Sequence, residues 1–195
     1  MKVIIIEGPD NTGKNTLIQN ILDNNKIVKL IHCDKPEDEV DPFEEQCRLF
    51  YTHAYYAAQD FKNNQIPYSG INVIVFNRFY QGEYVYGQMY RNGNPDKIKQ
   101  MVKICEDYLI NNIGYDNIYY VQLLSTSSKL LKKNDDGKSL SGADVEKMNK
   151  EIELFTDIYN FSQLKKHIIY VNDGDEFRTR EDILIEFNDF INTGI

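Results

Sequence analysis

Five short apolar runs, rich in β-branched and aromatic residues, recur along this 195-residue chain and constrain its fold more than any other feature. They occupy residues 3–6, 27–31, 73–76, 118–124 and 168–171. Their apolar character is continuous rather than alternating, which is typical of strands that are covered on both faces of a parallel sheet. Stretches with helical periodicity lie between them. The pattern therefore predicts an α/β fold with a five-stranded parallel sheet and helices on both faces.

The predicted helices span residues 13–24, 42–63, 95–112, 143–162 and 179–191. Two of them begin with an N-cap residue followed by proline, at Asp41-Pro42 and Asn94-Pro95. Residues 1–195 offer enough chain for one core of ordinary size, and we expect a single domain. In open sheets of this kind ligands bind beyond the carboxyl ends of the strands.

Composition narrows the range of partners. The net charge is −8, so a long phosphate backbone would be repelled, and nucleic acid is not an expected partner. A small anion can still be held by backbone amides. The cysteines Cys33, Cys47 and Cys105 are odd in number and widely spaced, which indicates reduced thiols and a cytoplasmic protein. The first apolar run is too short for a signal or a membrane span.

A glycine-rich motif stands between the first apolar run and the first predicted helix. It reads Gly8, Pro9, Asp10, Asn11, Thr12, Gly13, Lys14, Asn15 and Thr16. The glycines allow turns that aim successive N–H groups inward, the helix start adds its dipole, and Lys14 can reach the outer phosphates. Strand, loop and helix follow in the order that a P-loop requires, so the motif predicts a P-loop NTPase fold of three α/β/α layers that binds ATP.

Position 15 departs from the usual motif, where a serine or threonine hydroxyl ligates Mg²⁺. Three alternatives stay open: the amide oxygen of Asn15 ligates directly, it holds a metal-bound water, or the hydroxyl of Thr16 takes part. We expect Mg²⁺ to accompany ATP, with Asn15 and Thr16 as the candidate metal residues.

Residues 6–16 resemble the P-loop of thymidylate kinases, which read EGxDxxGKxT. Residues 73–80 look like a second motif of that family, "VIxDRY", and residues 82–91 look closer to thymidylate-kinase-like proteins encoded by bacteriophages. The resemblance implies a nucleoside monophosphate kinase that transfers the γ-phosphoryl group of ATP to a deoxynucleotide, namely dTMP or a modified pyrimidine relative. We expect the protein in the cytoplasm, or in the cytoplasm of the host cell if a bacteriophage encodes it.

The resemblance also implies roles for single residues. Asp10 corresponds to the acid that contacts the acceptor sugar, and Arg78 to the arginine that pairs with the acceptor phosphate, a role that suits a guanidinium fork. With Lys14 they form the expected catalytic set. Asn77 replaces the aspartate that the family associates with magnesium and its waters.

Further substrate contacts are expected from two segments of the chain. Arg48, Tyr51 and Tyr55 share one helix face, where an aromatic ring could stack on a base and a cation could face its phosphate. The alternative is that the tyrosines belong to the core and that Arg48 is solvated. Tyr84, in the phage-like segment, is the remaining candidate for substrate binding.

Residues from about 125 to 142 are polar and interrupted by glycine, and they look like the lid of a nucleotide kinase. This segment offers the lysines Lys129, Lys132, Lys133 and Lys138 where the family usually supplies arginine. The alternative is a solvated helix face.

Two other functions are consistent with the sequence. One is a P-loop kinase that acts on a deoxynucleoside or on a hydroxymethylated base in DNA. The other is a nucleotide-binding protein that has lost turnover, which the asparagines at positions 15 and 77 suggest. The sequence leaves open whether the chain forms a homodimer.

Overall fold

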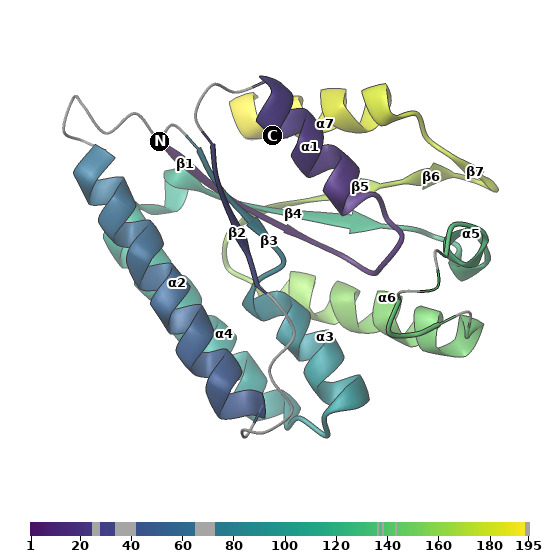
Figure 1. Ribbon diagram of the computed structural model, residues 1–195, viewed down its shortest axis with the longest axis horizontal. Coiled ribbons are helices and arrows are strands. Elements are labelled where there is room, and N and C mark those ends of the chain that lie inside the picture. Colours follow the sequence, from purple (N-terminus) through teal and green to yellow (C-terminus); the bar gives the residue numbers. More distant parts are fainter. Residues whose placement is uncertain are drawn as a thin grey trace.

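The five predicted strands form one parallel sheet in the order β2-β3-β1-β4-β5 (Figure 1). We obtained a computed structural model, which describes residues 1–24, 28–33, 42–64, 73–135, 137, 139–142 and 144–193. The strands are β1 (Lys2–Glu7), β2 (Val28–His32), β3 (Val73–Asn77), β4 (Ile118–Leu124) and β5 (Lys165–Tyr170). The predicted fold class is therefore confirmed.

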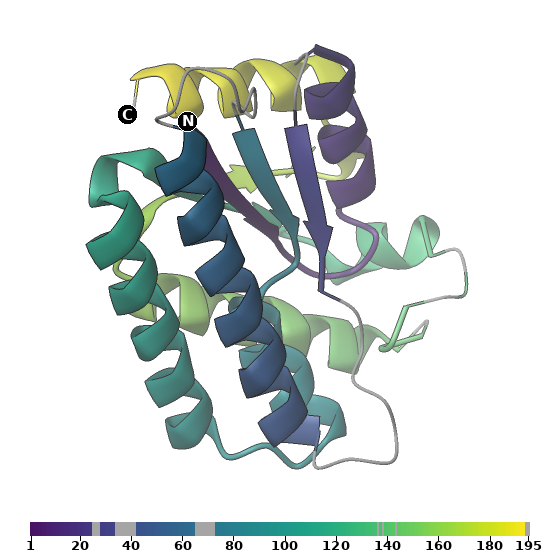
Figure 2. The ribbon, with the colours of Figure 1, turned by 60° about the vertical axis from the view of Figure 1, so that its left-hand side comes forward.

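Helices cover both faces of this sheet. One face carries α1 (Lys14–Asn24) and α7 (Arg180–Thr193), and the other carries α2 (Pro42–Asn64), α3 (Tyr80–Tyr90), α4 (Pro95–Ile113) and α6 (Val145–Phe161) (Figure 1). Helices α2 and α4 run side by side (Figure 2). Alternate residues of β1 enter different cores: Val3 and Ile5 pack with the four-helix side, and Ile4 and Ile6 with α1 and α7. This burial on both faces explains the continuous apolar runs.

Strand β1 lies at the centre of the sheet, between β3 and β4. Ile6 is in register with Asn77 at the end of β3, and Glu7 is in register with Gln122 in β4. After β1 the chain first forms β2 and β3, which lie on one side of β1, and then β4 and β5, which lie on its other side. The carboxyl end of β1 is therefore the place where an open α/β sheet binds its ligands.

Some boundaries differ from the predicted ones. The cap at Asn94 is confirmed, since its side chain accepts from the N–H groups of Asp96 and Lys97 (3.0 and 3.1 Å). Strand β5 begins at Lys165, earlier than predicted, because an edge strand tolerates polar residues. The predicted strand start at 27, cap at 41 and helix start at 143 lie outside the described residues.

The sequence pattern did not predict helix α3. Its residues include four tyrosines and two glycines, which are poor helix formers. Tertiary burial overrides this propensity, since every residue from Tyr80 to Gly87 is buried. The short elements η1 (Tyr115–Asn117) and α5 (Ser128–Lys133), and the antiparallel pair β6 (Asn172–Asp173) and β7 (Glu176–Phe177), were also not predicted.

Candidate functional site

The loop between β1 and α1 folds around its own lysine. Gly8 has a φ of 139°, and a Cβ there would lie 2.1 Å from Leu123 O, so only glycine fits. Lys14 Nζ donates to Gly8 O (2.8 Å) and Pro9 O (2.6 Å), and Thr12 Oγ1 also donates to Pro9 O (2.8 Å). The ammonium therefore lies at the start of α1, where unpaired backbone N–H groups favour an anion.

A cavity of about 330 Å³ opens over this loop. Its lining consists of Asp10, Asn11, Gly13, Lys14, Asn15, Arg78 and Ser139. The structure thus brings together the loop after β1, the arginine after β3 and one residue of the segment after β4. The three expected catalytic residues, Asp10, Lys14 and Arg78, all line this single cavity.

Arg78 is held from several directions. Its backbone has a φ of 64°, in the left-handed region that non-glycine residues rarely adopt, and its N–H donates to Ile6 O (3.1 Å). Its guanidinium pairs with Asp10 and lies 5.3 Å from the centre of the Tyr86 ring. Burial alone lowers the pKa of Arg78, but Tyr86, Asp10 and Glu7 outweigh burial and leave the pKa above its usual value.

Glu7, the last residue of β1, lies directly beneath this arginine's loop. It is fully buried, and its Oε1 accepts from the N–H groups of Phe79 (2.6 Å) and Gly82 (3.0 Å). Burial raises the pKa of Glu7 to about 7, even though the Phe79 N–H and the charges of Arg78 and Lys14 act in the other direction. Its second oxygen, Oε2, is without a hydrogen-bond partner among the described residues.

Two further groups have pKa values shifted toward neutrality. Burial lowers the pKa of Lys14 to about 8, and the nearby charge of Arg78 adds to this effect. Burial likewise raises the pKa of Glu151 in α6 to about 7, and Glu151 Oε1 accepts from the Tyr90 hydroxyl (2.9 Å). Clusters of groups with such shifts occur preferentially at functional sites.

Three polar side chains form a chain from the first turn of α1 across the ends of β3 and β2. Asn77 Nδ2 lies 3.1 Å from Asn15 Oδ1 and 3.0 Å from His32 Nδ1. Asn77 Oδ1 is buried, and no described residue hydrogen-bonds to it. Amide oxygens are hard, neutral ligands of the kind that suit Mg²⁺. Within the described ranges no group of three or more His, Cys, Asp or Glu side chains could hold a metal. These two amide oxygens suit a cation whose other ligands come from a bound anion or from water.

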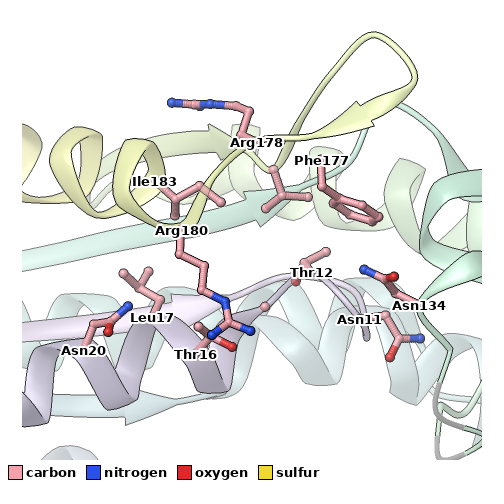
Figure 3. A pocket seen from close by; sticks show the side chains of 12 residues that line it. Asn11, Thr12, Thr16, Leu17, Asn20, Asn134, Phe177, Arg178, Arg180 and Ile183 are labelled. Atoms are coloured by element: carbon pink, nitrogen blue, oxygen red, sulfur yellow. The ribbon is translucent and has the colours of Figure 1, made fainter.

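A second cavity, of about 190 Å³, lies on the other side of the loop (Figure 3). It is lined by Asn11, Thr12, Gly13, Thr16, Leu17, Asn20, Asn134, Val171, Phe177, Arg178, Arg180 and Ile183. Figure 3 shows the Arg180 side chain extending from the start of α7 toward Thr16. Thr16, a candidate metal residue, lines this cavity, whereas Asn15 lines the first one.

A third, smaller cavity of about 70 Å³ lies beyond Arg78. It is lined by Cys33, Gln46, Phe50, Arg78, Phe79, Gly82, Glu83, Tyr86, Arg91 and Leu140. Arg91 pairs with Glu83, and the Tyr86 hydroxyl and Arg91 Nε are buried with no partner in the described part of the chain. Polar atoms of this kind are available to a ligand that enters the cavity.

The structure does not bring the α2 candidates to these cavities. Arg48, Tyr51 and Tyr55 are exposed, the two tyrosines by 38% and 49%, and none of them lines a cavity described above. The residues of α2 that face Arg78 are Gln46 and Phe50. Aromatic residues occur around much of α2, so sequence periodicity alone did not show which face turns toward the site.

Tyr84 is placed apart from Arg78 as well. It is 4% exposed, and its hydroxyl donates to Asp157 in α6. Lys99 donates to the same carboxylate (3.0 Å) and lies 5.0 Å from the Tyr84 ring centre. Tyr84 therefore connects α3 with α6, and the tyrosine of α3 that lies against Arg78 is Tyr86.

The segment after β4 contacts the loop at two points. Asn11 Nδ2 donates to Asp135 Oδ1 (3.3 Å), and the Leu140 N–H lies 3.4 Å from Asp10 Oδ2. Ser139 reaches the first cavity and donates to Asp135 Oδ1 (2.9 Å). The lysines Lys129, Lys132 and Lys133 are exposed on α5, and Lys138 lies outside the described residues.

Several residues of the site were not predicted from the sequence. Glu7 could have been recognised, because it is a single acid at the end of an otherwise apolar strand. No sequence pattern indicates Gln46, Tyr86 or Arg180, since only the packing of distant elements brings them to the cavities.

Comparison with known proteins gives likeness of fold only. The sequence matches no protein-family model and no curated protein. The YorR protein from Bacillus subtilis, whose crystal structure is a complex with phosphorylated GDP, is similar with a TM-score of 0.64 and 17% identity. That match covers 97% of this chain and 95% of YorR.

Polyphosphate Kinase 2 from Arthrobacter aurescens TC1 is similar with a TM-score of 0.59 and 17% identity, over 86% of this chain and 60% of that one. No helix in the described ranges is both long and apolar enough to cross a membrane. These likenesses agree with the sheet order described above and establish an α/β fold for this chain that it shares with both proteins.

Proposed function

We propose that this protein is a nucleotide kinase that transfers the γ-phosphoryl group of ATP to a deoxynucleoside monophosphate, dTMP or a related pyrimidine nucleotide. The observation that carries the proposal is the lining of one cavity by both Lys14 and Arg78. The lysine belongs to a loop built for phosphates, and the arginine approaches from a different strand. Two cations from separate elements suit two phosphate-bearing substrates that meet between them.

The three cavities form a series. The second cavity shares Asn11 and Gly13 with the first, and the third shares Arg78 with it. This order supports a donor whose base lies near Arg180 and whose phosphates lie over the loop. The acceptor would lie beyond Arg78. The terminal phosphate of the donor would then point toward the acceptor.

Such a reaction needs alignment and charge stabilisation rather than a covalent intermediate. Lys14 and Arg78 would neutralise charge that develops on the transferring group, and Asp10 would orient Arg78 through their ion pair. A bound Mg²⁺ would supply further charge neutralisation on the donor phosphates. Asn15 and Asn77 are the residues that would hold it. The segment from about 125 to 142 would act as a lid, since Ser139 and Leu140 already reach the site.

The identity of the acceptor rests on the resemblance to thymidylate kinases. A coupled assay of ADP release tests it, with a panel of dTMP, dCMP, dUMP, dGMP, thymidine and duplex DNA that contains hydroxymethylated bases. We expect turnover with pyrimidine deoxynucleotides. Turnover only with thymidine or with DNA would assign one of the alternative acceptors, and binding of ATP with no turnover across the panel would indicate a nucleotide-binding protein.

Restoring a carboxylate to the cation site should strengthen its metal binding. In the variant Asn15→Ser with Asn77→Asp, a negative charge enters beside His32 and a hydroxyl replaces the amide. We expect the affinity of the protein for Mn²⁺ in the absence of nucleotide, measured by electron paramagnetic resonance, to rise about tenfold. The reason is that the charge of the ligands governs the affinity for such ions. The Mg²⁺ concentration needed for half-maximal rate should fall.

Asn149→Asp is the matched control, because it adds the same charge at an exposed position of α6. It should leave Mn²⁺ affinity unchanged. Unaltered metal affinity and rate in the double variant would show that positions 15 and 77 do not belong to the metal site.

A further inference from the structure

We propose that Glu7 is a positioning residue for the acceptor side of the site, because its carboxylate fixes the backbone that aims Arg78. The inference rests on the proposed function. Glu7 is fully buried and lines none of the cavities, so it acts through Arg78 rather than on a substrate.

The carboxylate holds the chain immediately after Arg78. Glu7 Oε1 accepts from the N–H of Phe79, the next residue, and from the N–H of Gly82 in the first turn of α3. On its other side Arg78 is held by the bond from its own N–H to Ile6 O. Two adjacent residues of β1, Ile6 and Glu7, therefore bracket a residue whose backbone lies in the strained left-handed region.

The sequence of α3 leaves room for this contact. A Cβ on Gly82 would lie 3.2 and 3.3 Å from the two carboxylate oxygens of Glu7, tighter than ordinary contact. Glycine is less favourable than alanine within a helix. The helix thus carries its glycine where the carboxylate of Glu7 needs close approach to the backbone.

Charge also connects Glu7 to the arginine. The charged and titratable groups that interact with Glu7 are Lys14 of the loop, Arg78 after β3, Tyr86 of α3 and Tyr120 of β4. Lys14 in turn interacts with Asp10 and with Glu151 of α6. Arg78 and Lys14 favour its ionised form, and burial opposes it. Since burial raises the pKa of Glu7 to about 7, its negative charge is present mainly above neutral pH.

The test compares steady-state kinetics of the wild type with the variants Glu7→Gln and Gly82→Ala, with ATP and dTMP varied in turn. Glutamine keeps the shape of the side chain and removes its charge. Alanine at position 82 keeps the charge and displaces the carboxylate, but it also adds a methyl group to the lining of the third cavity, so Glu7→Gln is the deciding variant. We expect both variants to lower kcat/KM for the acceptor by about tenfold to a hundredfold, as for a misaimed catalytic group, and to change KM for ATP by less than about twofold.

The pH dependence separates charge from packing. The ratio of acceptor kcat/KM between the wild type and Glu7→Gln should rise from pH 6 to pH 8, because only the wild type gains a negative charge there. Titration of Glu151 and of the acceptor phosphate is common to both proteins and cancels in the ratio. The pKa of Lys14, lowered to about 8 by burial, also responds to the charge of Glu7, so kcat/KM for ATP is measured over the same pH range to report the contribution of Lys14. Gly82→Ala should keep the pH dependence of the wild type.

Glu106→Gln provides the matched control. Glu106 in α4 is also a buried acid, 1% exposed, and it accepts from Ser162 Oγ (2.6 Å) and the Gln163 N–H (2.8 Å), away from the cavities. Its loss should leave both kinetic constants unchanged. The proposal for Glu7 would be overturned if the wild type is active and the acceptor constants survive in Glu7→Gln, or if Glu7→Gln impairs donor and acceptor use equally. Absence of activity in the wild type would instead reject the proposed function.

Discussion

Replacing Lys14 with alanine is expected to lower the rate of phosphoryl transfer by about a hundredfold or more while the fold stays intact. The ammonium is the cation of the loop, and its present partners are two backbone carbonyls of that loop. In the proposed reaction it stabilises charge on the donor phosphates as the one cationic side chain among residues 8–16. The assay is the coupled release of ADP with saturating ATP and acceptor.

The thermal stability of Lys14→Ala should not fall, although its activity does. The pKa of Lys14 is lowered to about 8 by burial, so below that pH the folded protein carries a charge that the unfolded chain accommodates more easily. Removal of the amine relieves this cost at pH 7, and thermal unfolding should show an unchanged or higher Tm.

Lys103→Ala is the matched control for the loss of a lysine. Lys103 is 59% exposed on α4, pairs with Asp107 and is remote from the cavities, and its loss should change neither rate nor Tm by a measurable amount. Near-normal turnover by a well-folded Lys14→Ala protein would exclude this loop as the donor site.

Much of the fold could be predicted because its main determinants are local in the sequence. Continuous apolar runs report burial on both faces, so the five strands and their parallel pairing followed directly. Helix α3 could not be predicted in this way. Its tyrosines and glycines disfavour a helix, and only contacts with distant elements, such as that between Gly82 and Glu7, make it one.

The same distinction applies to the candidate site. The loop after β1 and Arg78 could be located from motifs, because each lies at the carboxyl end of a strand. Gln46 and Phe50 line the third cavity, whereas Tyr51 and Tyr55 are exposed. Which side of α2 faces the cavity depends on the rotation of the helix against its neighbours, and the composition of the helix does not show this rotation.

Arg78→Lys should strongly weaken use of the acceptor and leave ATP affinity nearly unchanged. The guanidinium lies between the first and third cavities, paired with Asp10 and packed on Tyr86. A lysine supplies a point charge that cannot contact Asp10 and a phosphate in the same planar geometry. We expect kcat/KM for the acceptor to fall by about tenfold to a hundredfold, equivalent to about 1.4 to 2.8 kcal/mol. KM for ATP should change by less than about twofold, because Lys14 and the start of α1 hold the donor.

Lysine is the informative substitution at this position. Arginine and lysine tolerate a φ of 64° equally poorly, so the exchange changes the head group and leaves the backbone strain as it is. Arg48→Lys is the control: it makes the same change on the exposed face of α2 and should leave all constants unaltered. A selective rise in KM for ATP, with acceptor kinetics preserved, would place Arg78 on the donor side. The order of the three cavities along the reaction would then be reversed, and the resemblance to thymidylate kinases would no longer assign the acceptor.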